Sequence, residues 1–269
     1  MPNLKLNAVR RWAPWLALVV VFSVATSLLS WWQFDRREDR VAKIEMVTLN
    51  YDKPAVPLSE IDWTFDAGEP VNEWRKVIVS GSYLPDQSVI VRNRPLSGQP
   101  GFLQLVPLKL TDGQILMVER GWLAAGSPVT SPASNPLPDS GPRELVVRLR
   151  LAEADLGRDE VPGQLASLHI ASLSDKLGPE LITEFYGRLV SEEPAMAENP
   201  RPMPKPSLNE GNHLSYALQW ILFGLMAFAA LIWAIGNERR LRLEAAGLLT
   251  PKTKRVTQAQ LDAQSEDAQ

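Results

Sequence analysis

Two long apolar stretches stand out in the pattern of hydrophobic and polar positions along the chain. Residues 15–34 (WLALVVVFSVATSLLSWWQF) and 214–237 (LSYALQWILFGLMAFAALIWAIGN) carry no charged side chain. A helix of about 20 residues covers the roughly 30 Å hydrocarbon core of a bilayer. Tryptophan and tyrosine lie near the ends of both stretches, and these residues favour the membrane surface. The pattern therefore predicts a membrane protein with two transmembrane helices.

A cleaved signal peptide is the alternative interpretation of the first stretch, because Lys5, Arg10 and Arg11 precede it. The apolar run is longer than the core of a usual signal peptide, and no site of the A-x-A type follows it. We therefore interpret it as an uncleaved anchor. No Arg- and Ser-rich transit sequence precedes it, so a mitochondrial import route is not indicated.

Basic residues beyond the far ends of both stretches predict the orientation, because positively charged flanks stay in the cytoplasm. We expect residues 1–14 and 238–269 to be cytoplasmic and residues 41–212 to lie outside, in the periplasm at a bacterial inner membrane. Residues 41–213 hold 16 Lys and Arg against 23 Asp and Glu, a net charge of −7, which suits this assignment. The basic residues after the second stretch are Arg239, Arg240, Arg242, Lys252, Lys254 and Arg255.

The region between the stretches predicts a β-rich domain. Asp112–Gly113 is a hairpin signal between two alternating segments, and residues 171–178 are typical of a short helix. Residues 126–142 and 194–207 each contain five prolines, which predicts a long loop and an extended tether to the second stretch. The expected fold is one α+β domain with a mainly antiparallel sheet between two transmembrane helices. The predicted strands are 77–84, 88–92, 102–110, 115–124, 144–153 and 185–190.

Composition removes several kinds of chemistry. The chain has no cysteine, which excludes disulfides, thiolate metal sites, covalent haem attachment and cysteine nucleophiles. It has only two histidines, His169 and His213, too few for a multi-histidine metal centre. A formal net charge of −3 gives no reason to expect nucleic acid as a partner.

No catalytic motif is present either: GxSxG, HExxH, Walker A, GxGxxG and the EF-hand loop are all missing. His169 has no carboxylate close in sequence, and we expect it to be solvated or half-buried. The pairs Asp159–Glu160 and Glu192–Glu193 fall in polar segments, where we expect solvated charges. We therefore predict that the protein is not an enzyme.

The start of the second apolar stretch is more informative. His213, Tyr216 and Trp220 have the spacing i, i+3, i+7 and share one helical face, with Gln219 beside it. One interpretation is an imidazole and a phenol that reach for water at the membrane surface, with tryptophan as an anchor. The other is an axial haem ligand, because a neutral imidazole at this depth can bind haem iron. The spacing alone leaves both open.

Four segments resemble the surfeit locus protein one family, which comprises membrane factors for the assembly of cytochrome c oxidase. Their order and spacing follow the family over almost the whole chain. The family usually has Asn or Asp before Arg120–Gly121–Trp122, whereas Glu119 stands here, and the tryptophan expected around 160–170 is missing. The segments are 28–40 (LLSWWQFDRREDR), 73–94, 98–124 with Arg120–Gly121–Trp122, and 212–220 (NHLSYALQW).

The resemblance implies an accessory protein that receives haem a and aids its insertion into cytochrome c oxidase subunit one, with haem a synthase as a further partner. Carried onto this chain, the resemblance implies that His213 would be the candidate haem ligand, with Tyr216 and Trp220 beside it. Trp31 and Trp32, at the outer end of the first stretch, would face the haem ring, and Arg36 and Arg37 would pair with its propionates.

Two other classes of function remain to be weighed. A membrane-anchored hydrolase would need a nucleophile and a base, and the sequence shows no such pair. A structural or sensory membrane protein, whose outer domain binds another protein, is the alternative that the chemistry leaves open.

Overall fold

The computed structural model describes residues 3–61, 71–158 and 161–250, which fall into two compact units. One unit comprises the residues up to Asp39 and from Glu210 on, and the other is Arg40–Asn209. The pair Asp159–Glu160 lies outside the described residues, as do Lys252, Lys254 and Arg255.

Helices α1 (Asn3–Asn50) and α3 (His213–Ala245) contain the two apolar stretches, and both are long and apolar enough to cross a membrane. Helix α1 continues well past residue 34, because residues 35–50 contain no glycine or proline that would end it. Its 48 residues correspond to about 72 Å, more than twice the thickness of a hydrocarbon core.

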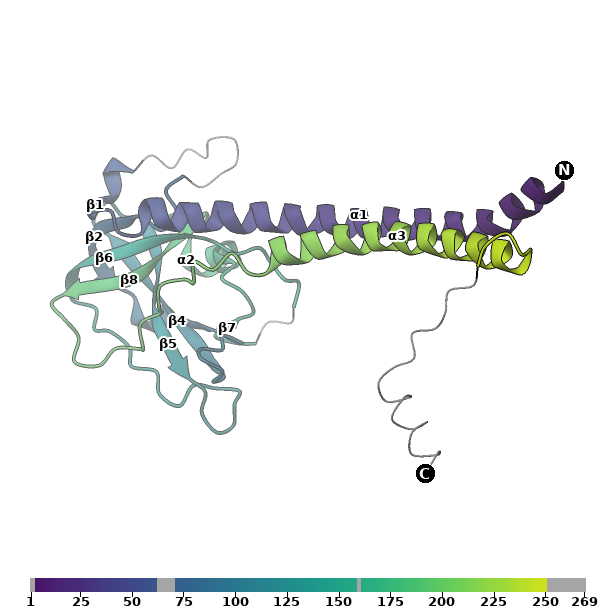
Figure 1. Cartoon of the computed structure of the whole chain (residues 1–269). Helices are drawn as coiled ribbons and strands as arrows, with labels where there is room; N and C mark the ends of the chain where they lie inside the picture. The colour runs from purple at the N-terminus through teal and green to yellow at the C-terminus, as the bar shows by residue number, and fades with distance from the viewer. Residues whose placement is uncertain (1–2, 62–70, 159–160, 251–269) are drawn as a thin grey trace, which may run out of the picture. The chain divides into compact units, whose positions relative to one another are not determined.

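In the first unit, α1 and α3 lie side by side and run antiparallel (Figure 1). Trp12 on α1 donates its indole N–H to Glu238 on α3 over 2.7 Å. Further along, the hydroxyl of Ser30 donates to the backbone oxygen of Ala217 over 3.0 Å. Residues near the start of α1 thus contact residues near the end of α3, and residues further along α1 contact the start of α3.

The unit Arg40–Asn209 is built on a sheet, as the alternating segments predict (Figure 1). Short helices connect its strands: η1 (Leu58–Glu60), η2 (Pro85–Gln87), η3 (Ile170–Leu173) and α2 (Ser174–Leu177). The strands are β1 (Val56–Pro57), β2 (Lys76–Tyr83), β3 (Val89–Val91), β4 (Gly101–Leu110), β5 (Ile115–Ala124), β6 (Pro142–Leu151), β7 (Gln164–Leu165) and β8 (Phe185–Glu193).

Five of these strands close into a barrel in the order β2-β6-β8-β5-β4, because β4 pairs back onto β2. The pairs β5–β8, β1–β2 and β3–β7 are parallel. The sheet is therefore mixed, which corrects our prediction of a mainly antiparallel sheet. The long excursion between β6 and β8 explains the parallel pair, because a connection of that length can bring a strand back in either direction.

Two apolar clusters account for the burial of β4 and β5 on both faces. One draws on all five barrel strands, with Val79, Leu108 and Leu145 among its members, and fills the barrel interior. The other packs outside the barrel, where Leu168, Ile170 and Leu177 cover β4 and β5. Both strands are therefore covered on two sides, although their sequences alternate.

Candidate functional site

Small side chains bring α1 and α3 close together in the first unit. Thr26 and Ser30 on α1 and Ala217 on α3 are almost completely buried. A Cβ added to Gly224 would lie 3.0 Å from the hydroxyl oxygen of Thr26, closer than nearly all real Cβ contacts. Interfaces of small residues let two helix backbones approach each other within a membrane.

At the end of this interface where α3 begins, the predicted haem ligand has a partner on the other helix. The Nδ1 atom of His213 lies 2.9 Å from Oε1 of Gln33. One turn further on, Arg37 forms an ion pair of 2.8 Å with Glu210. The two helices therefore meet in a polar layer at the level of His213.

The other predicted site residues are spread around this layer. Trp31, Trp32 and Tyr216 are exposed by 70%, 52% and 50%, so they do not pack into the helix interface. Trp220 is half-buried, and the centre of its ring lies 5.7 Å from that of Phe223, with the two rings nearly perpendicular. Arg36 is exposed and lies 3.8 Å from Asp39, one turn along the same helix.

An apolar groove of about 390 Å³ starts at Trp31 and runs along the helix pair. It is lined by Val20, Val24, Leu28 and Phe228, with Ser23 and Ser27 as the polar members. The sequence had indicated neither this groove nor the role of Gln33. The sequence does contain a feature that indicates Gln33. It is the last polar residue of the uncharged stretch 15–34, and it lies at the same depth along the helix pair as His213.

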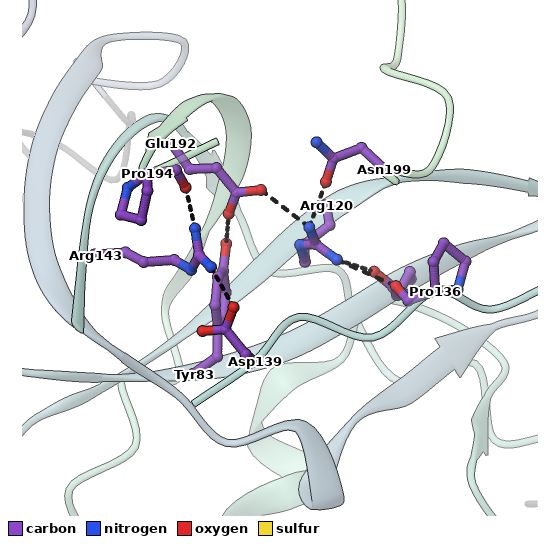
Figure 2. A network of polar contacts seen from close by, with 9 residues as sticks. Tyr83, Arg120, Pro136, Asp139, Arg143, Glu192, Pro194 and Asn199 are labelled. Atoms are coloured by element: carbon purple, nitrogen blue, oxygen red, sulfur yellow. Dashed lines mark hydrogen bonds and ion pairs between the residues drawn. The ribbon is translucent and has the colours of Figure 1, made fainter. Parts of the chain in front are cut away.

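A second polar arrangement lies in the barrel unit, around Arg120 (Figure 2). The Arg120 side chain is completely buried and that of Glu192 is 3% exposed, and they pair over 3.0 Å. Arg120 also donates to Gln104 over 3.1 Å, to the backbone oxygen of Pro136 over 3.2 Å, and to the side chain of Asn199. One guanidinium thus joins β4, β5 and β8 to the 126–142 loop and the tether.

Tyr83 completes this network by donating its hydroxyl to Glu192 over 3.2 Å. Burial and the neighbouring Glu192 carboxylate raise the pKa of Tyr83 far above its ordinary value, so the phenol keeps its proton. Our interpretation of Glu192 as a solvated charge is therefore wrong. The reason is long-range: β8 brings Glu192 beside an arginine far away in sequence, which compensates for its burial.

Gly121 and Trp122 dock the tether onto β5. Trp122 and Arg201 exchange two backbone hydrogen bonds of 2.7 and 2.9 Å. A Cβ on Gly121 would lie 2.6 Å from the backbone oxygen of Arg201, and its φ of 149° also favours glycine. Trp122 is buried, and its indole N–H donates to the backbone oxygen of Arg94 over 2.6 Å, so its ring packs within the barrel unit.

Two further residues discussed in the sequence analysis are His169 and Glu119. His169 is half-buried, as expected. Glu119 is fully buried and pairs with Arg188, whose Nε lies 2.9 Å from one carboxylate oxygen. Among the residues that the structure describes, no three His, Asp or Glu side chains come together as a possible metal site.

Comparisons with known proteins place the chain among related sequences. The family model described as "SURF1 family" matches residues 20–225. Uncharacterised SURF1-like proteins of Mycobacterium bovis and Mycobacterium tuberculosis are 28% identical over 249 residues, covering 88% of this chain and 89% of theirs. A SURF1-like protein of Rickettsia bellii is 25% identical over 232 residues, covering 82% of this chain and 89% of its own.

Proposed function

The chain belongs to the SURF1 family, and we propose that it is an accessory factor for cytochrome c oxidase assembly that receives haem a and aids its insertion into subunit one. The proposed source of haem a is haem a synthase. The proposed location is a bacterial inner membrane, with the barrel unit in the periplasm, both termini in the cytoplasm and lipid around the two helices. The proposed role is to bind and deliver haem, not to catalyse a reaction.

One observation carries the haem part of this proposal: His213 is bonded through Nδ1 and keeps Nε2 for a ligand. Haem a supplies an iron that accepts a neutral imidazole as its axial ligand. The residues present fit this group, because His213 sits at the end of an apolar helix pair and the groove at Trp31 can take an apolar tail.

The propionates of haem a need cationic partners at the polar end of the site. Arg37 already pairs with Glu210 at 2.8 Å, whereas Arg36 is more exposed and is 3.8 Å from its nearest acidic neighbour Asp39. Arg36 is therefore the better candidate to bind a propionate. In this proposal Arg37 holds the two helices together, and Trp31 and Trp32 offer exposed rings at the membrane surface.

The test compares the only two histidines of the chain. The full-length protein is produced in cells that make haem a, purified in detergent, and analysed for haem a per polypeptide by its absorption spectrum. We expect His213→Ala to lose most of the bound haem a and His169→Ala to keep it. Unchanged haem a in the His213→Ala protein would contradict His213 as the ligand, and an equal loss in both variants would point to a structural effect.

A further inference from the structure

The contact between His213 and Gln33 determines more than a position, because the two ring nitrogens of histidine are chemically distinct. The atom that faces Nδ1 of His213, at 2.9 Å, is the amide oxygen Oε1 of Gln33. An amide oxygen can only accept a hydrogen bond, so this contact favours the tautomer of the neutral ring that has its hydrogen on Nδ1. The lone pair then remains on Nε2, which is the form that binds a metal through that atom.

The surroundings of Nε2 are consistent with this assignment. Residue 211 is a glycine, and a Cβ there would lie 3.6 Å from Nε2 and 3.5 Å from the adjacent ring carbon. Residue 211 therefore places no side chain against Nε2. Gly211 also has a φ of 77°, a conformation that other residues adopt only with strain.

Gln33 is held firmly enough to orient a ring. It lies on α1 between Ser30, which bonds to Ala217 over 3.0 Å, and Arg37, which pairs with Glu210 over 2.8 Å. These contacts tie α1 to α3 on one side of Gln33, and to the segment just before α3 on the other. A hydrogen-bond partner on a fixed helix sets the tautomer and orientation of a ligating histidine, as carboxylates and carbonyls do in metal sites.

We propose that Gln33 is a positioning residue for haem a: it selects the Nδ1–H tautomer of His213 and so makes Nε2 the iron-binding atom. This inference rests on the proposed function only for the identity of the cargo. The tautomer itself is a property of the protein without haem, so it can be measured separately.

The first measurement uses nitrogen-15 NMR of the full-length, haem-free protein labelled at histidine, in detergent at alkaline pH. His213→Ala assigns the signals, since only His169 then remains. We expect the Nδ1–H form of His213 in the parent protein and in Gln33→Glu, whose carboxylate still accepts a hydrogen bond. In Gln33→Leu the tautomer ratio should shift by roughly fivefold toward Nε2–H, the effect of one ordinary hydrogen bond.

The second measurement is haem a affinity by spectroscopic titration of the same proteins. Gln33→Leu should bind about tenfold more weakly, the lower end of what loss of such a partner costs a metal ligand, and Gln33→Glu should restore binding. The matched control is Gln219→Leu, at an exposed glutamine of α3 in the second turn after His213. It should leave both the tautomer and the affinity unchanged.

The outcomes separate the inference from the proposed function. An Nε2–H tautomer in the parent protein, or one that Gln33→Leu leaves unchanged, would overturn the role of Gln33. Equal haem a affinity in Gln33→Leu and the parent would also overturn it. If the tautomer shifts as expected but His213→Ala still binds haem a, the proposed haem site fails while the hydrogen bond stands.

Discussion

Arg120 shows at the scale of a single residue why a buried charge is kept in this barrel. Its side chain is fully buried, and its hydrogen bonds reach Gln104, Glu192, Asn199 and the backbone of Pro136. Each of these partners comes from a different segment of the chain. Burying an ion pair contributes little stability by itself, but removing one partner leaves the other charge uncompensated.

Replacing Arg120 by methionine should therefore destabilise the protein strongly. We expect a loss of about 3–5 kcal/mol in the free energy of unfolding of the barrel unit, measured by urea denaturation of the full-length protein in detergent. The matched control is Arg158→Met at an exposed position of the same unit, which should change stability by less than about 0.5 kcal/mol.

A compensating variant tests the physical cause. Adding Glu192→Leu to Arg120→Met removes the stranded carboxylate, so the double variant should regain part of the lost stability. The account of the buried pair is wrong if Arg120→Met is as stable as the parent. It is also wrong if adding Glu192→Leu lowers the free energy of unfolding by as much again as Arg120→Met alone.

Gly121 provides a second prediction, because its missing side chain makes room for the tether. In Gly121→Ala, the new Cβ meets the backbone oxygen of Arg201, a steric conflict that costs about 1–3 kcal/mol. Pro200 is buried and the chain has no cysteine, so Pro200→Cys introduces a single protected thiol. Alkylation of this thiol should become about tenfold faster when Gly121→Ala is added.

Gly236→Ala is the control for that measurement, since a Cβ there meets nothing within 4 Å. The alkylation rate of Pro200→Cys should be the same with and without it. A thiol that stays equally protected in the Gly121→Ala protein would show that the glycine is not needed for docking of the tether.

At the scale of elements, the helix pair depends on close packing rather than on apolar bulk. Most large apolar side chains of α1 and α3 are exposed. Among the described side chains of the first unit, the buried positions on these helices are Thr26, Ser30, Ala217, Gly224 and Leu231. In a membrane, lipid tails would contact such exposed leucines and valines as well as another helix does. The small residues therefore set which faces of the two helices meet.

Gly224→Leu should separate the helices, because even a Cβ at this position is only 3.0 Å from Thr26. Cysteines placed at Ser30 and Ala217 report on the interface, since these residues are hydrogen-bonded and no native thiol competes. After proteolysis of the barrel unit, oxidative cross-linking should join the two helix fragments in the parent background and fall severalfold with Gly224→Leu. Equal cross-linking in Gly224→Leu and in the control Gly236→Leu would refute this.

At the scale of the whole molecule, the barrel unit begins and ends at neighbouring points. Arg40 donates to the backbone oxygens of Asn209 and Ser207 over 3.1 and 3.3 Å. Lys205 pairs with Asp52 over 2.9 Å and lies 4.4 Å from the centre of the Tyr51 ring. The chain therefore enters and leaves this unit side by side, as an insertion between two membrane helices requires.

The predicted orientation in the membrane follows from the neighbouring ends of the barrel unit and from the basic residues near both ends of the chain. A reporter that is active only in the periplasm should work when fused after Gly157, in an exposed segment of the barrel unit, and should fail when fused after Thr250. A cytoplasmic reporter should give the opposite pattern. Activity of the cytoplasmic reporter at Gly157 would overturn the predicted orientation.

Much of the secondary structure could be predicted from local sequence. The β4–β5 hairpin with its Asp112–Gly113 turn, and β2 and β6, lie close to the predicted ranges. The two predicted apolar stretches lie within α1 and α3, although α1 extends well beyond its predicted range. His213 was singled out because a polar residue at the start of an apolar helix is unusual. Such features depend on neighbours in the sequence, so the pattern of residues is enough to indicate them.

Only the tertiary structure decided which distant residues became partners. The parallel β5–β8 pair, the closure of β4 onto β2, the burial of Glu192 against Arg120 and the hydrogen bond from His213 to Gln33 all join remote segments. A charge or an amide looks the same in the sequence whether it meets water or a partner. Its role is fixed by which segment arrives beside it, and that depends on packing of the whole chain rather than on local propensity.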